Sequence, residues 1–178
     1  AIEDTSIVEL AELMIGRKGE SVVDAQPRTG HSDKVALRLR DLKVRMPGEK
    51  VRGVDLDVYE GEIFGIGGLA GQGKLGIPNG VMGLYDTTGT VELFGEPLKT
   101  GDTGAALHAG LAMVSEDRKG VGLLLDQSIE DNIVFNAMQI HGEYLKKFGP
   151  FTLKDSKAIR DVANRMIQEL DIRCFGPT

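Results

Sequence analysis

Apolar and polar residues alternate along two neighbouring stretches of the chain, residues 35–46 and 51–60. Alternation with a period of two is typical of strands that bury one face. The first stretch changes phase at Asp41, which predicts a bulge or a break, and the PGEK sequence between the stretches predicts a turn. The apolar positions in step are Val35, Leu37 and Leu39, then Leu42, Val44 and Met46, then Val54, Leu56 and Val58. We therefore expect an antiparallel, half-exposed sheet.

Two other apolar runs do not alternate, which favours strands buried on both faces, as in a parallel sheet. They are EIFGIGG at residues 62–68 and the start of LAMVSEDRK at residues 111–119, which continues into a polar loop. The elements expected between them are a helix at 76–85, a hairpin-like strand at 89–98 and a short helix at 103–110.

Helical patterns mark both ends of the chain. Residues 5–16 predict a short amphipathic helix with a capping box at Ser6 and Glu9 and a stop at Gly16. Such a helix is marginal alone in water, so we expect it to have a partner. Residues 18–34 then have the composition of a linker. The clearest amphipathic helix covers residues 156–172; its apolar positions are Ile159, Val162, Ala163, Met166, Ile167 and Leu170.

The stretch GGLAGQGKLGI, residues 67–77, carries the candidate chemistry. Gly68, Gly73 and Lys74 fit the pattern G-x-x-x-x-G-K of a phosphate-binding loop, in which glycine backbones aim N–H groups at an anion and the lysine adds a cation. Leu75 stands where a hydroxyl normally gives an oxygen to Mg²⁺, and Gly76 offers no substitute. The alternative is a glycine-rich turn that binds nothing. If the following helix begins at Gly73, we expect Pro78 to kink it.

Composition sets outer limits on function. The chain has 178 residues, a net charge of -6 and a pI near 5.1, which argue for one domain with appendages and against a broad nucleic-acid face. Its apolar runs are too short to cross a bilayer. The three histidines show no metal-ligand spacing with the single cysteine, Cys174, which we expect to be a packing residue. These features predict a cytoplasmic protein without a metal site.

A P-loop hydrolase would also need an acid that holds magnesium, and the chain offers one weak candidate. Asp126 ends the apolar run GLLLDQ and could hold magnesium, although the spacing favours a loop residue. Arg118 and Lys119 could touch phosphate or a partner, but charges after a strand are more often solvated. The segment 130–138 is expected to be helical.

Three stretches resemble the second ATP-binding cassette of bacterial sugar-importer ATPases of the ribose, galactose and xylose type, in which two cassettes are fused in tandem. They are VYEGEIFGIGGLAGQGK, VELFGEPL and MVSEDRKGVGLLLDQSIEDNI. The resemblance implies an α/β fold with a P-loop NTPase core of the ABC ATPase type, an antiparallel β subdomain and the start of a helical subdomain, truncated there. The implied divisions are a tail helix of the preceding cassette at 1–17, a linker at 18–34, the antiparallel subdomain at 35–60, the core with its Q-loop at 61–150, and the helical subdomain from 151 to 178.

The resemblance also implies a site. The nucleotide-binding residues would be Gly68, Leu69, Ala70, Gly71, Gln72, Gly73, Lys74, Leu75 and Gly76. Glu116 falls at the Q-loop position and Met46 on the adenine side, where a methionine lacks an aromatic face. Because the signature helix, the magnesium strand and its catalytic glutamate would follow later, the resemblance implies no catalytic or metal-binding residue here, and weak ATP binding without a need for Mg²⁺.

The implied partners are the first cassette of the same polypeptide and membrane permease subunits, with no nucleic acid. The resemblance also implies that the parent protein is cytoplasmic and binds peripherally to the inner face of the cell membrane. Helix 130–138 could then pack under a membrane subunit or be a simple core helix. The alternative is a structural cassette that binds no nucleotide and acts as a scaffold. A small P-loop kinase would need an arginine-bearing lid, for which the sequence gives no sign.

Overall fold

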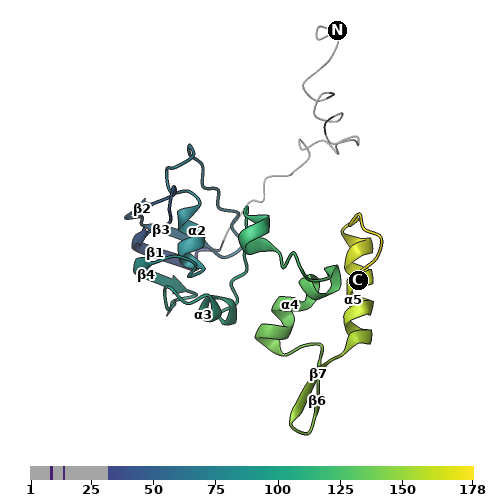
Figure 1. Cartoon of the computed structure of the whole chain (residues 1–178). Coiled ribbons are helices and arrows are strands. Elements are labelled where there is room, and N and C mark those ends of the chain that lie inside the picture. Colours follow the sequence, from purple (N-terminus) through teal and green to yellow (C-terminus); the bar gives the residue numbers. More distant parts are fainter. Residues whose placement is uncertain (1–8, 10–13, 15–31) are drawn as a thin grey trace.

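The computed structural model describes Glu9, Met14 and residues 32–178 (Figure 1). Apart from Glu9 and Met14, which are helical, the helix expected at 5–16 lies outside the described residues, as does most of the linker expected at 18–34. The strands are β1 (Val35–Val44), β2 (Val51–Arg52), β3 (Leu56–Tyr59), β4 (Thr87–Leu93), β5 (Glu96–Pro97), β6 (Leu145–Phe148) and β7 (Phe151–Lys154). The helices are α2 (Gly76–Val81), α3 (Thr103–His108), the π-helical turn η3 (Arg118–Gly122), α4 (Ile129–His141) and α5 (Ser156–Glu169).

Strand β1 is the centre of the antiparallel sheet. It pairs with β2 and β3 along one edge and with β4 along the other, and β5 pairs with β4. Its register against β4 shifts between Arg40 and Lys43. Asp41, inside that shift, has a φ of 47°, and its N–H donates to a side-chain oxygen of Asp55 at 2.6 Å. The antiparallel sheet and the bulge at Asp41 are both confirmed.

Helix α2 covers one face of this sheet (Figure 1). The alternating apolar residues of β1 and β4 turn toward it, because a strand presents every second side chain to the same face. The buried cluster is Leu39, Leu42, Val44, Val51, Val81 and Val91. This cluster holds α2, and the loop that precedes α2, against the strands.

A second, smaller core joins α4 to α5. Its buried residues are Val134, Met138 and Ile159. Each helix begins with a side-chain cap: Ser128 accepts from the N–H of Asp131, and Asp155 accepts from the N–H of Ala158. The helices expected at 130–138 and 156–172 are therefore confirmed. The hairpin β6–β7 between them, which turns at a Gly-Pro pair, was not predicted.

The strands expected at 62–68 and at the start of 111–119 are absent, so this prediction was wrong. Both segments lack regular structure up to η3, and Ile63 is 84% exposed while Val114 is fully exposed. A buried strand needs neighbours for its backbone N–H and C=O groups, and no strand among the described residues pairs with either segment. The two segments nevertheless share one apolar groove, which Phe64, Ile66 and Met113 help to line.

Two smaller expectations also need correction. Cys174 is exposed rather than packed, because it lies in the irregular segment after α5. Helix α2 begins at Gly76 and not at Gly73, so Pro78 lies in the first turn, where a backbone N–H needs no helical partner. The proline therefore does not kink the helix. The helix at 103–110 and the hairpin-like strand at 89–98 are confirmed by α3 and by β4–β5.

Candidate functional site

The phosphate-binding sequence forms a tight loop directly before α2. Gly71 has a φ of 79° and Gly73 a φ of 89°, both in the left-handed region that favours glycine. Gly73 is buried against the carbonyl oxygen of Lys50, which a Cβ at this position would approach to 3.0 Å. These conformations turn the N–H groups of Gly71 and Gly73 toward one point, and we call this pair of N–H groups the anion nest.

The carboxylate of Glu49 occupies the anion nest. One oxygen accepts a hydrogen bond from Gly71 N at 2.6 Å and the other accepts from Gly73 N at 2.7 Å. Glu49 is 7% exposed and is the only buried polar or charged residue in the part of the chain that the structure describes. A carboxylate is buried only where its charge finds partners, and here the two N–H groups of the nest are those partners.

The surroundings of Glu49 stabilise its charged form. The N–H of Gly71 lowers the pKa of Glu49 below its ordinary value of 4.5, and the N–H groups of Gly73 and Leu75 and the charge of Lys74 act in the same direction. Burial opposes this shift but is outweighed. Glu49 is therefore a carboxylate, and not a neutral acid, at physiological pH.

The lysine of the loop is turned back on its own chain. Lys74 Nζ donates to the carbonyl oxygen of Leu69 at 3.2 Å. Leu75 supplies no side-chain oxygen, and its carbonyl accepts from the side-chain amide of Asn79 at 2.7 Å. The loop thus has N–H donors and a cation for phosphate, but the magnesium-binding hydroxyl is missing at the position where the motif places it.

The other residues expected at the site are Met46, Glu116 and Asp126, and the structure places them differently relative to the loop. Met46 is half-buried in the same β1–β2 turn as Glu49, accepts from Glu49 N at 3.2 Å and packs against the sheet core. Glu116 is exposed just before η3, and no hydrogen bond or ion pair in the described region joins it to the loop. Asp126 is an exposed loop residue. Across the described residues, no three His, Cys, Asp or Glu side chains gather as a metal site would require.

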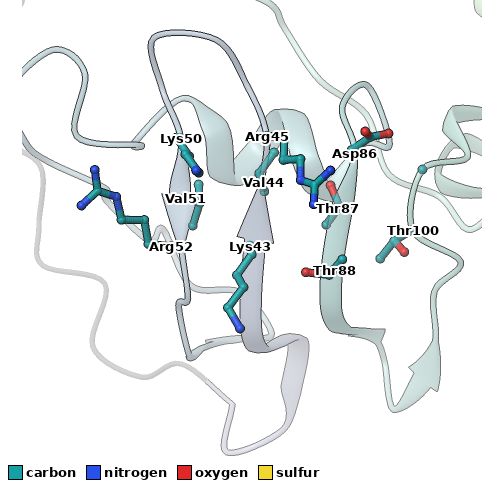
Figure 2. A pocket seen from close by; sticks show the side chains of 11 residues that line it. Lys43, Val44, Arg45, Lys50, Val51, Arg52, Asp86, Thr87, Thr88 and Thr100 are labelled. Carbon is teal, nitrogen blue, oxygen red and sulfur yellow. The ribbon is translucent and has the colours of Figure 1, made fainter.

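A separate basic cavity of about 690 Å³ lies along β1, β2 and β4. Figure 2 shows its lining residues, which include the cations Lys43, Arg45, Lys50 and Arg52 and a single acid, Asp86. All four cations are exposed, and Lys43 is paired with Asp41 at 2.7 Å. No residue from 68 to 76 lines this cavity, so its positive charge belongs to the sheet and not to the loop.

Sequence reasoning found the loop but missed Glu49. The residue stands in PGEK, a polar turn that predicts solvent exposure, and no spacing rule connects it to glycines 22 and 24 positions later. Only the packing of the β1–β2 turn against the loop brings them together.

A glycine-rich anion nest between a sheet and a short helix, followed by a lysine, defines a protein of the phosphate-binding-loop class. The family model described as ABC transporter matches residues 51–174. That is most of the chain, and the chain belongs to this family, whose fold is the P-loop NTPase fold of ABC ATPases.

Curated relatives agree with this assignment. Over 177 residues the chain is 29% identical to the ribose import ATP-binding protein RbsA of Caldanaerobacter subterraneus, covering 99% of this chain and 34% of that protein. It is 33% identical to the ribose import ATP-binding protein RbsA 2 of Rhizobium meliloti, with 98% and 32% covered. The nucleoside import ATP-binding protein NupA of Lactococcus lactis is 29% identical, with 97% and 33% covered. The chain thus spans about a third of the length of these relatives.

In the described part of the chain, none of the helices combines the length and the apolar character needed to cross a membrane.

Proposed function

We propose that the chain is part of the ATP-binding subunit of an ABC importer for sugars or related small solutes, and that its loop is a degenerate nucleotide site. The resemblance to the second of two tandem cassettes and the relatives' names support the importer. The binding half of the proposal is supported by the Glu49 carboxylate, an oxygen anion that accepts hydrogen bonds from Gly71 N and Gly73 N of the loop.

In this proposal, residues 68–76 bind the phosphates of ATP. The N–H groups of the nest and the Lys74 side chain receive phosphate oxygens, and Met46 lies on the adenine side. Affinity is weak and depends little on Mg²⁺, because Leu75 supplies no oxygen to the metal. Glu116 is the Q-loop position. None of these residues is a base or a metal ligand for hydrolysis, so the chain by itself does not turn over ATP.

The proposed divisions of the chain follow from the same family pattern. Residues 1–17 are the tail helix of a preceding cassette and 18–34 a linker, followed by the antiparallel subdomain at 35–60, the core at 61–150 and the helical subdomain from 151 to 178. The proposed partners are that preceding cassette and the membrane permease subunits. The protein would therefore work on the cytoplasmic face of the membrane, bound peripherally.

A second function is favoured by one observation. Because Glu49 fills the anion nest from within the chain, the loop could serve only to pack the β1–β2 turn, as a structural cassette that binds no nucleotide.

Calorimetry with ATP, with and without Mg²⁺, separates the two functions. We expect the 178-residue chain to bind ATP weakly at millimolar concentration with little change on adding Mg²⁺. Lys74→Ala should abolish this binding, and Leu75→Ser should make it dependent on Mg²⁺. Absence of binding to the chain and to Leu75→Ser would favour the structural cassette. ATP turnover well above that of Lys74→Ala would contradict the absence of hydrolysis.

A further inference from the structure

We propose that Glu49 is an internal gate of the loop: its carboxylate occupies the position of a phosphate group, and it must leave before a nucleotide phosphate enters. This inference rests on the proposed nucleotide-binding function and adds a regulation of that same site.

The geometry carries the first step. The two oxygens of Glu49 accept from Gly71 N and Gly73 N at 2.6 and 2.7 Å, so a single planar acid bridges both donors of the anion nest. These are the N–H groups that the motif offers to two oxygens of a phosphate. Each N–H donates one hydrogen bond along one direction. A carboxylate and a phosphate therefore cannot occupy the nest at the same time.

Charge carries the second step. Glu49 is 7% exposed and charged, and its cationic neighbour, Lys74, is turned to the carbonyl of Leu69. A phosphate that entered beside the carboxylate would bring a second anion into contact with a poorly solvated one, which is repulsive. Phosphate entry and departure of the Glu49 side chain therefore happen together. Lys74 can then turn from the Leu69 carbonyl toward the incoming anion.

The side chain can leave while its backbone stays. Glu49 lies in the turn between β1 and β2, outside the pairs Lys43↔Arg52 and Val44↔Val51 that fix the two strands. Its N–H donates to the Met46 carbonyl at 3.2 Å, and its own carbonyl rests against Gly76, so the main chain is held on both sides. Rotation of the Glu49 side chain opens the nest without breaking the sheet.

A gate of this kind lowers the apparent affinity by the fraction of molecules that are open. A nest closed in nine molecules of ten weakens binding about tenfold. Glu49→Gln should remove most of this penalty, because a glutamine amide offers one oxygen to the nest and turns an N–H₂ donor toward the second N–H.

The test compares ATP and inorganic phosphate binding to the 178-residue chain, to Glu49→Gln and to Glu62→Gln, by calorimetry. Glu62 is the matched control because it is also a glutamate that accepts from one backbone N–H, that of Tyr59 at 2.8 Å, outside the nest. We expect Glu49→Gln to bind both ligands about tenfold more tightly, and Glu62→Gln to bind them as the unaltered chain does.

The outcomes separate the gate from the proposed function. Equal affinity of the unaltered chain and a folded Glu49→Gln, or weaker binding by Glu49→Gln, overturns the gate and leaves nucleotide binding standing. No binding by any of the three chains overturns nucleotide binding itself, and the gate with it.

A measurement on the unaltered chain does not depend on the variant folding. In a phosphate titration followed by NMR, the Glu49 carboxyl carbon and the Gly71 and Gly73 amides should shift together, with one dissociation constant. Shifts of the two amides with an unmoved Glu49 carboxyl signal would show that the acid stays in place, and would overturn the gate.

Discussion

Gly76 is the residue on which the position of the loop depends most directly. A Cβ added there would collide with the carbonyl oxygen of Glu49 and approach a methyl group of Val51 to 2.8 Å. The first turn of α2 can therefore lie on the β1–β2 turn only because this position has no side chain. The phosphate-loop motif does not specify which residue stands at position 76. The need for a glycine there comes from packing alone.

We expect Gly76→Ala to lower the melting temperature of the chain, with a loss of about 1–3 kcal/mol from overpacking. Gly65→Ala is the matched control, because a Cβ at Gly65 meets nothing within 4 Å and its φ is not in the left-handed region. Thermal unfolding followed by circular dichroism measures both. An unchanged melting temperature in Gly76→Ala would contradict the close approach.

At this scale, sequence could predict what each loop residue offers but not what it touches. That Leu75 offers no side-chain oxygen follows from residue type alone. The role of Glu49 does not, because a glutamate in a Pro-Gly turn is indistinguishable from a solvated one until the fold packs that turn against Gly71 and Gly73.

Among the elements, β1 and β3 are joined by charge as well as by backbone pairing. Arg40 donates to one oxygen of Asp57 at 2.8 Å and Arg38 donates to the other at 3.1 Å. The side chain of Asp57 is 25% exposed. The hydrogen bond from Arg40 is the main reason that the pKa of Asp57 lies below its ordinary value of 3.8, and Arg38 adds to the shift.

This shift gives the sheet a pH dependence with a definite sign. A lowered carboxyl pKa stabilises the folded chain above the unfolded-state value of 3.8, and that stabilisation is lost as pH falls through the lower folded-state value. We expect Asp57→Asn to lower the melting temperature at neutral pH and to flatten its decline below about pH 5. Asp126→Asn, at an exposed acid without an ion pair in the described region, should follow the unaltered profile. Identical slopes for all three chains would contradict the prediction.

Alternating apolar patterns predicted the secondary structure of this chain better than continuous apolar runs did. Alternation predicted β1, and its phase change predicted the bulge at Asp41, because both are local properties of a strand with one buried face. The continuous runs at 62–68 and 111–119 predicted buried strands, but they form no strands and none of their residues is buried. A central strand is defined by its neighbours, and the described residues provide none for these runs.

At the scale of the whole molecule, the described residues form two small cores, and apolar side chains stay exposed on the segments that were expected to be strands. The sheet and α2 share one core and α4 and α5 share the other. Ile63 is 84% exposed, Leu69 78% and Val114 fully exposed, which is unusual for residues of this type.

We expect the chain to bind a hydrophobic dye such as anilinonaphthalene sulfonate in its native state. The double substitution Ile63→Ser and Val114→Ser should reduce the dye fluorescence and leave the melting temperature unchanged, because these side chains bury little surface. Leu39→Ser, in the buried cluster, is the contrasting control: it should lower the melting temperature and raise the fluorescence. Undiminished fluorescence in the double variant would contradict the prediction that the dye binds at Ile63 and Val114.

The large sequence separation between Glu49 and the glycines that it contacts affects the order in which the chain folds. The acid and the two glycines are 22 and 24 residues apart, and β1, which leads into the turn of Glu49, pairs with β4 across a still longer separation, as at Leu39↔Val91. Distant pairings close more slowly than hairpins and helices. The β4–β5 hairpin and α4 should therefore form early, and the anion nest should be completed last, when the sheet closes around it.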